Sequence, residues 1–134
     1  MATTNDQRTT VAEMVAEAKR QVENLTPAQV AAELRDGGPL LVDLREPAER
    51  AEHGVIPGAV HAPRGMLEFY ADPASSYHRA EFQPDRRVVL HCASGGRSAL
   101  AAVALARLGY ADVAHLDGGI RAWKEQGQPT EAAG

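Results

Sequence analysis

The residues best suited to chemistry in this sequence gather around Cys92, the only cysteine among its 134 residues. The six residues that follow it are Ala93, Ser94, Gly95, Gly96, Arg97 and Ser98. Two adjacent glycines let the backbone curl tightly and direct successive N–H groups at a negatively charged atom. An isolated cysteine is more often an ordinary core residue, but this turn and the nearby Arg97 favour the thiolate, which is the reactive form. We therefore predict that Cys92 is a nucleophile.

The polar side chains next to Cys92 have separate predicted roles. The planar guanidinium of Arg97 suits a sulfur oxyanion or a phosphate, because its N–H groups form a fork. Ser98 is placed either to cap the helix that follows or to hydrogen-bond the thiolate. His91 precedes Cys92 on a predicted strand, where neighbouring side chains point to opposite faces. We therefore assign His91 a structural role rather than that of a general base for Cys92.

Apolar runs at residues 39–45, 87–91 and 113–116 predict the buried strands that position these groups. Helical patterns are predicted at residues 10–23, from residue 27 to a stop at Gly37, at residues 98–108 and at residues 120–126. Strands that alternate with helices through short turns imply a mainly parallel sheet covered by helices on both faces. The sequence therefore predicts the α/β fold class.

The ends of the helices and the irregular segments also have sequence signals. Thr10 and Thr26 each have a Glu or Gln three residues later, which is the pattern of a capping box. Residues 64–86 are rich in Asp, Pro and Ser, and they predict a long connection with one helical turn. We expect frayed ends at residues 1–10 and 128–134.

Ligands of open parallel sheets bind outside the carboxyl ends of the strands, where the adjoining loops converge. The residues predicted at such ends are Asp43, Arg45, Cys92 and Asp117. We expect them to share one crevice, with Asp43 and Arg45 as a buried ion pair that supports the loops. We also predict that Arg64 and Met66, from the long connection, form a wall of this crevice.

Composition excludes several classes of partner. The net charge is −4, whereas a nucleic-acid or anionic-membrane surface needs clustered Lys and Arg. No apolar run is long enough for a membrane span. A single cysteine forms neither an internal disulfide nor a zinc-finger set, which indicates a reducing compartment. We therefore predict a cytoplasmic, single-domain protein that needs no metal or cofactor.

Four motifs, in this order along the chain, resemble the single-domain rhodanese family. They are Val42-Asp43-Leu44-Arg45-Glu46-Pro47, Ile56-Pro57-Gly58-Ala59, Cys92-Ala93-Ser94-Gly95-Gly96-Arg97-Ser98, and Leu116-Asp117-Gly118-Gly119 with Trp123. The resemblance implies a rhodanese-like fold with a central sheet of about five short strands. It divides the chain into an N-terminal amphipathic helical extension (1–24), a rhodanese-like domain (25–128) and a C-terminal tail (129–134).

The resemblance implies a thiosulfate sulfurtransferase that works in two steps. Cys92 would take the outer sulfur of thiosulfate, or of another small anionic sulfane donor, and hold it as a persulfide. The loop N–H groups from Ala93 to Ser98 would stabilise the terminal sulfur, and Arg97 would help to hold the donor. Since the sequence has no second cysteine, we expect an external thiol or cyanide as the acceptor. The N-terminal helix is expected either to pack on the sheet or to mediate homo-oligomerisation.

Two other functions stay open from the sequence. A cysteine phosphatase also cradles an anion in a loop between a cysteine and an arginine, and His91-Cys92 resembles the start of that signature. Phosphatases of that type place five residues between the two, whereas four lie between Cys92 and Arg97, which favours a single sulfur over a phosphate. A rhodanese-like module can instead dock a partner or carry sulfur for it; modules that only dock often lack the cysteine, so the intact loop argues against that reading.

Overall fold

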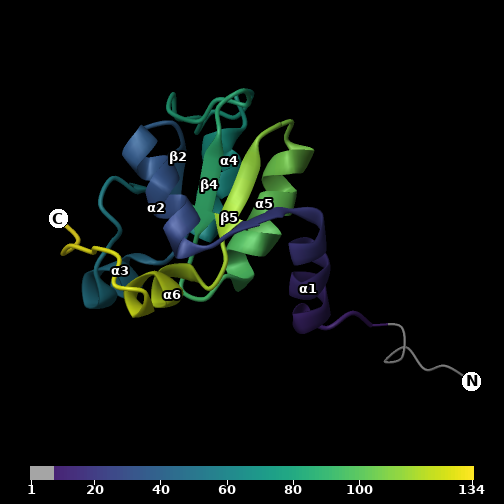
Figure 1. Ribbon diagram of the computed structural model, residues 1–134. Helices are drawn as coiled ribbons and strands as arrows, with labels where there is room; N and C mark the ends of the chain where they lie inside the picture. Colours follow the sequence, from purple (N-terminus) through teal and green to yellow (C-terminus); the bar gives the residue numbers. More distant parts are fainter. Residues whose placement is uncertain (1–7) are drawn as a thin grey trace, which may run out of the picture.

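The computed structural model describes residues 8–134 and shows a five-stranded sheet with helices on both faces (Figure 1). The strands are β1 (Glu23–Leu25), β2 (Leu40–Asp43), β3 (Val60–His61), β4 (Val88–His91) and β5 (Val113–Leu116). The helices are α1 (Val11–Gln21), α2 (Pro27–Asp36), α3 (Pro47–His53), α4 (Leu67–Ala71), α5 (Gly96–Arg107) and α6 (Gly119–Glu125), and Arg64–Met66 forms a 3-10 turn. The predicted α/β class is confirmed.

The sheet has the order β1-β5-β4-β2-β3, and all its paired strands are parallel. On β4, Leu90 faces the core under α4 and α5, whereas its neighbour Val89 faces the core under α2 and α6. A strand buried on both faces has no polar side, which explains why the strands read as continuous apolar runs. The central position of β4 places the residues after His91 at the middle of the carboxyl edge of the sheet.

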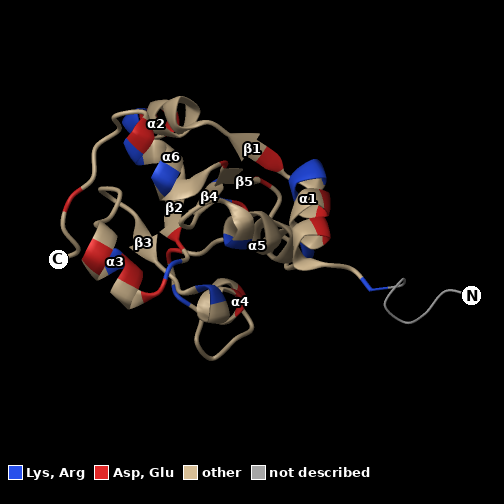
Figure 2. Cartoon of the chain, turned by 90° about the horizontal axis from the view of Figure 1, so that it is seen from below, with Lys and Arg blue, Asp and Glu red and all other residues tan. Residues whose placement is uncertain are grey.

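Helix α1 begins at the predicted capping box but ends earlier than residue 23. Thr10 Oγ1 accepts the N–H of Glu13 at 3.1 Å, and the Glu13 carboxylate accepts the N–H of Thr10 at 3.2 Å. Acidic side chains lie near the start of α1 and basic ones at its end, which suits the helix dipole (Figure 2). The helix ends at Gln21, and the next residues pair with β5 as strand β1. The Asn24 amide, which donates to two carbonyls near the helix end, stabilises this exit.

Helix α1 packs against α5 rather than on the sheet (Figure 1). Its Ala18 is buried, while Val11 and Met14 remain exposed. Self-association through this helix stays a prediction. The predicted boundary between residues 24 and 25 falls inside β1, and the domain limits also stay a prediction.

The C-terminal tail is held in place, which corrects the expectation of a frayed end. Val55 and Glu131 form a two-way backbone bridge with N–O distances of 2.8 and 2.9 Å. The Trp123 indole also donates to the carbonyl of Pro129 at 2.8 Å. Residues 1–7 of the predicted N-terminal fray lie outside the described residues. Within residues 8–134, no helix is both long and apolar enough to cross a membrane.

Candidate active site

Cys92 lies directly after β4, in a short loop that leads into α5. Its side chain is 1% exposed, and the sulfur accepts the N–H of Gly95 at 3.2 Å. Gly95 has a φ of 105°, a left-handed conformation that other residues rarely adopt. Helix α5 starts at Gly96, two residues earlier than predicted, so its first turn lies next to the thiol. The helix dipole and this N–H group both favour negative charge on the sulfur.

Helix α6 fixes the Cys92 loop from the other side. The N–H of Ile120 donates to the Cys92 carbonyl at 2.9 Å, and the N–H of Arg121 donates to the Ala93 carbonyl at 3.1 Å. Such a close approach requires Gly119, because a Cβ at this position would lie 2.4 Å from the Ala93 oxygen. The Asp117-Gly118-Gly119 turn therefore supports the reactive loop, although Asp117 itself is ion-paired with Lys19.

A chain of buried polar side chains extends from the Cys92 sulfur into β5. The sulfur lies 3.6 Å from Ser98 Oγ, which lies 2.8 Å from His115 Nδ1. His115 Nε2 in turn lies 2.7 Å from Asn24 Oδ1. Ser98, which was predicted either to cap α5 or to bond the thiolate, sits inside the first turn of α5 and contacts the sulfur directly.

The Asn24 amide determines where the protons of this chain lie. Its nitrogen donates to two backbone carbonyls, so its oxygen faces His115 and must accept from Nε2–H. A neutral His115 therefore has a bare Nδ1, which accepts the Ser98 hydroxyl proton in preference to the longer contact from Ser98 to the Gly95 carbonyl (3.3 Å). When Cys92 is protonated, the remaining acceptor for its thiol proton is Ser98 Oγ.

Sequence reasoning assigned no role to His115, and its place in this chain is a finding of the structure. Strand alternation is a signal that could have found it. Ala114 and Leu116 face α2 and α6, so His115 must face α5, on the same side as Cys92.

Burial of His115 predicts a pH-dependent loss of stability. Burial lowers its pKa from 6.5 to about 4; the charge of Asp117 opposes this shift, and the charge of Lys19 adds to it. Between these two values the unfolded chain binds more protons than the folded one. Stability is therefore fully present above pH 6.5 and is lost as the pH falls toward 4, by up to about 3 kcal/mol.

Chemical denaturation of wild type and His115→Gln between pH 7 and pH 4 checks this prediction. The variant, which cannot titrate at this position, is expected to lose less stability over that range. The exposed His53 provides the matched control, because His53→Gln should keep the wild-type change in the free energy of unfolding with pH. Equal losses of unfolding free energy between pH 7 and pH 4 in wild type and His115→Gln would contradict the prediction.

Asp43 and Arg45 form the buried pair predicted from the sequence. Arg45 donates to both carboxylate oxygens of Asp43, at 3.1 and 2.9 Å, and to the carbonyl of Gly54 at 2.8 Å. Burial opposes ionisation of Asp43, but hydrogen bonds from Arg45 and the nearby charges hold its pKa at about 2. The pair joins the end of β2 to the end of α3.

His91 lies on the opposite face of β4 from Cys92, as strand alternation requires. Its Nε2 is 3.8 Å from Asp43, and burial lowers the pKa of the ring. Its Nδ1 contacts only the Cys92 carbonyl, at 3.3 Å. This placement agrees with a structural role and leaves the Cys92 sulfur without contact from this imidazole.

Arg97 is held by an acidic residue that sequence reasoning missed. Its two terminal nitrogens donate to the two carboxylate oxygens of Glu49, on α3, at 2.7 and 2.9 Å. Hydrogen bonds from Arg97 lower the pKa of Glu49 to about 2, so the pair is ionised at neutral pH. The guanidinium fork that was expected to help hold a donor is therefore engaged by Glu49.

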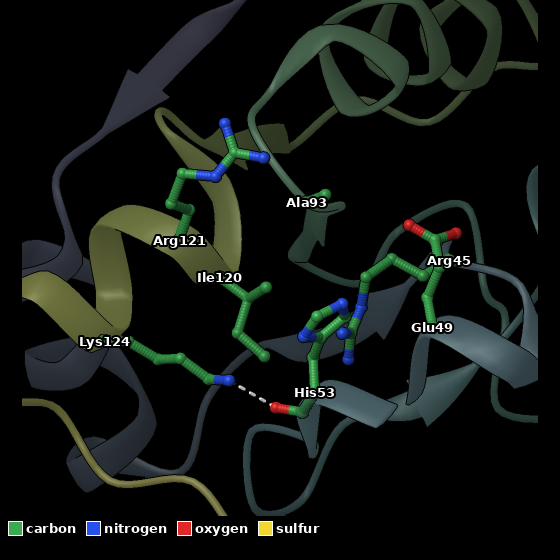
Figure 3. A pocket seen from close by; sticks show the side chains of 7 residues that line it. All are labelled: Arg45, Glu49, His53, Ala93, Ile120, Arg121 and Lys124. Carbon is green, nitrogen blue, oxygen red and sulfur yellow. Dashed lines mark hydrogen bonds between the residues drawn. The ribbon is translucent and has the colours of Figure 1, made fainter. Parts of the chain in front are cut away.

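A pocket of about 240 Å³ opens beside the Cys92 loop, between α3 and α6 (Figure 3). Its walls are Arg45, Glu49, His53, Ala93, Ile120, Arg121 and Lys124. The predicted wall residue Arg64 lies elsewhere: it pairs with Glu68 at 2.7 Å and lines a groove between α1 and α5. Met66 ends the half-buried 3-10 turn after β3. Helices α3 and α6 line this pocket, whereas the sequence predicted that the long connection would line it.

The fold that carries this loop has counterparts among known proteins. The family profile of the rhodanese-like domain matches residues 26–126. The chain belongs to the rhodanese family. Its relatives include a sulfurtransferase of Allochromatium vinosum, 41% identical over 69% of this chain and 78% of that protein.

Two further rhodanese relatives carry different descriptions. The thiosulfate sulfurtransferase GlpE of Pseudomonas syringae is 32% identical over 73% of this chain and 84% of its own. The solved structure of RPA3614 from Rhodopseudomonas palustris, a protein of unknown function and possible tyrosine phosphatase, is 42% identical. It superposes with a TM-score of 0.87 over 92% of this chain and 95% of its own. This rhodanese-like domain therefore has relatives named as sulfurtransferases and one described as a possible tyrosine phosphatase.

Proposed function

We propose that this rhodanese-like domain transfers sulfane sulfur through a persulfide on Cys92. The observation that carries the proposal is the Gly95 N–H, aimed at the Cys92 sulfur at the positive end of α5. A loop of this kind stabilises a thiolate before the reaction and a charged terminal sulfur after it. The single thiol and the relatives named as sulfurtransferases support the same chemistry.

The first step loads the enzyme. The Cys92 thiolate attacks the outer sulfur of thiosulfate, forming a bond between the two sulfurs. The S–S bond within thiosulfate breaks, and sulfite leaves with its electron pair. The terminal sulfur of the new persulfide carries the negative charge toward the N–H groups between Ala93 and Ser98, at the start of α5.

The second step transfers the sulfur to an external acceptor. A thiolate or cyanide attacks the terminal sulfur, and Cys92 leaves as a thiolate. Atoms and charge balance without an oxidant or a reductant. Since Cys92 is the only cysteine in the sequence, no internal thiol can resolve the persulfide. A reducing compartment, which keeps this thiol free, suits the cycle.

A cysteine phosphatase is the rival that the description of RPA3614 raises. The loop of four residues between Cys92 and Arg97 argues against it, as does the engagement of Arg97 by Glu49. We expect the purified protein to form thiocyanate from thiosulfate and cyanide, with no aryl phosphate hydrolysis that depends on Cys92. Aryl phosphate hydrolysis that Cys92→Ser abolishes, without any sulfur transfer, would show that the proposal is wrong.

A further inference from the structure

The pocket between α3 and α6 has an unsatisfied buried cation in its wall. Arg45 is 1% exposed, and its Nη1 has no hydrogen-bond partner among residues 8–134. Its other guanidinium nitrogens are taken by Asp43 and by the Gly54 carbonyl. In Figure 3 the Arg45 side chain extends into the pocket next to His53. A buried guanidinium N–H without an acceptor is unfavourable, and a ligand oxygen would satisfy it.

The charges around this pocket favour an anion. Arg121 and Lys124 reach it from α6, and within residues 8–134 neither has an acidic partner. The one acidic side chain in the wall, Glu49, has both oxygens engaged by Arg97. Lys124 donates to the His53 carbonyl, which holds its ammonium group at the rim (Figure 3). The pocket thus combines positive charge with free N–H donors.

The position of the pocket links it to the Cys92 loop. Ala93, which follows Cys92 in the chain, lines the pocket, and Ile120 contributes an apolar side chain to its centre (Figure 3). A ligand anchored here by an anionic group would have a short hydrocarbon segment along Ile120. Its opposite end would lie at the Cys92 loop. These features fit a small organic thiol that carries a carboxylate a few bonds from its sulfur.

We propose that this pocket binds the carboxylate of a low-molecular-weight thiol that accepts sulfur from Cys92. The inference rests on the proposed function, since it identifies the acceptor of the second step. The acceptor thiolate attacks the terminal sulfur of the persulfide and forms a new S–S bond. The bond from that sulfur to Cys92 breaks, so Cys92 leaves as a thiolate and the acceptor leaves as a persulfide. Arg45 binds the carboxylate through its unpaired Nη1, and Lys124 and Arg121 add positive charge to the wall.

The first test measures anion recognition at Cys92 without sulfur transfer. Iodoacetate and iodoacetamide alkylate a thiolate by the same reaction, but only iodoacetate carries a carboxylate. We expect the iodoacetate-to-iodoacetamide rate ratio to fall about tenfold in the double variant Arg121→Gln/Lys124→Gln. Arg107→Gln removes one positive charge at the far end of α5 and should keep the wild-type ratio. An unchanged ratio in the double variant overturns the proposal.

The second test follows discharge of a preloaded Cys92 persulfide by 3-mercaptopropionate and by 2-mercaptoethanol. The double variant should react about tenfold more slowly with the first thiol and within twofold of wild type with the second. Equal effects on both thiols overturn the assignment of the acceptor. If no persulfide forms at all while the alkylation ratio still falls, the proposed function fails and the anion site stands.

Discussion

Replacement of Cys92 by serine is expected to reduce sulfur transfer from thiosulfate to cyanide by at least about a thousandfold. A serine hydroxyl is a far weaker nucleophile toward sulfur, and it forms no persulfide. The fold should persist, because a serine oxygen can still accept the Gly95 N–H and contact Ser98. Thiocyanate formation and thermal unfolding, measured on the same preparations, check both parts.

Thermal unfolding distinguishes loss of chemistry from loss of structure in this variant. The unfolding temperature of Cys92→Ser should stay within a few degrees of wild type. A folded variant that retains a tenth of the wild-type rate would contradict the assignment of Cys92 as the nucleophile.

Gly119→Ala is expected to destabilise the protein by about 3 kcal/mol or more and to remove most of its activity. The added Cβ would lie 2.4 Å from the Ala93 oxygen and 2.6 Å from the Cys92 oxygen, and both are backbone atoms that cannot move independently. The φ of 63° adds strain for any residue with a side chain. The substitution therefore displaces the reactive loop from α6. Chemical denaturation and thiocyanate assays measure the two effects.

Gly109→Ala is the matched control for this prediction. Gly109 also has a positive φ, of 94°, but a Cβ there would meet no atom within 4 Å. This variant should suffer only backbone strain, about 1–2 kcal/mol, and should keep its activity. Similar losses of stability and activity in the two variants would refute a specific role for close packing at Gly119.

Local sequence signals predicted helices α1, α2, α5 and α6 and the inner strands well, because a start or a stop signal marks each of them. Gly37, Gly109 and Gly127 all have the positive φ expected of helix-ending glycines. Strand β1 was missed because Leu25 continues the apolar spacing of the preceding helix. Only the hydrogen bonds with β5, about ninety residues away in sequence, make this segment extended.

The reactive loop could be predicted because its chemistry lies in consecutive residues. Its supports could not, because they come from distant parts of the chain. Glu49 reaches Arg97 across 48 residues, and Asn24 reaches His115 across 91. The pocket wall was assigned to the connection after β3, whereas α3 and α6 form it, since their placement depends on how the helices pack on the sheet.

Mass spectrometry of the intact protein after incubation with thiosulfate tests the central claim most directly. We expect a gain of one sulfur atom that is located on Cys92, is removed by a thiol and is absent from Cys92→Ser. Loading of the protein with thiosulfate or with another sulfane donor should require no added cofactor. Absence of the adduct with every sulfane donor, or the same adduct on Cys92→Ser, would contradict the claim that Cys92 carries sulfur.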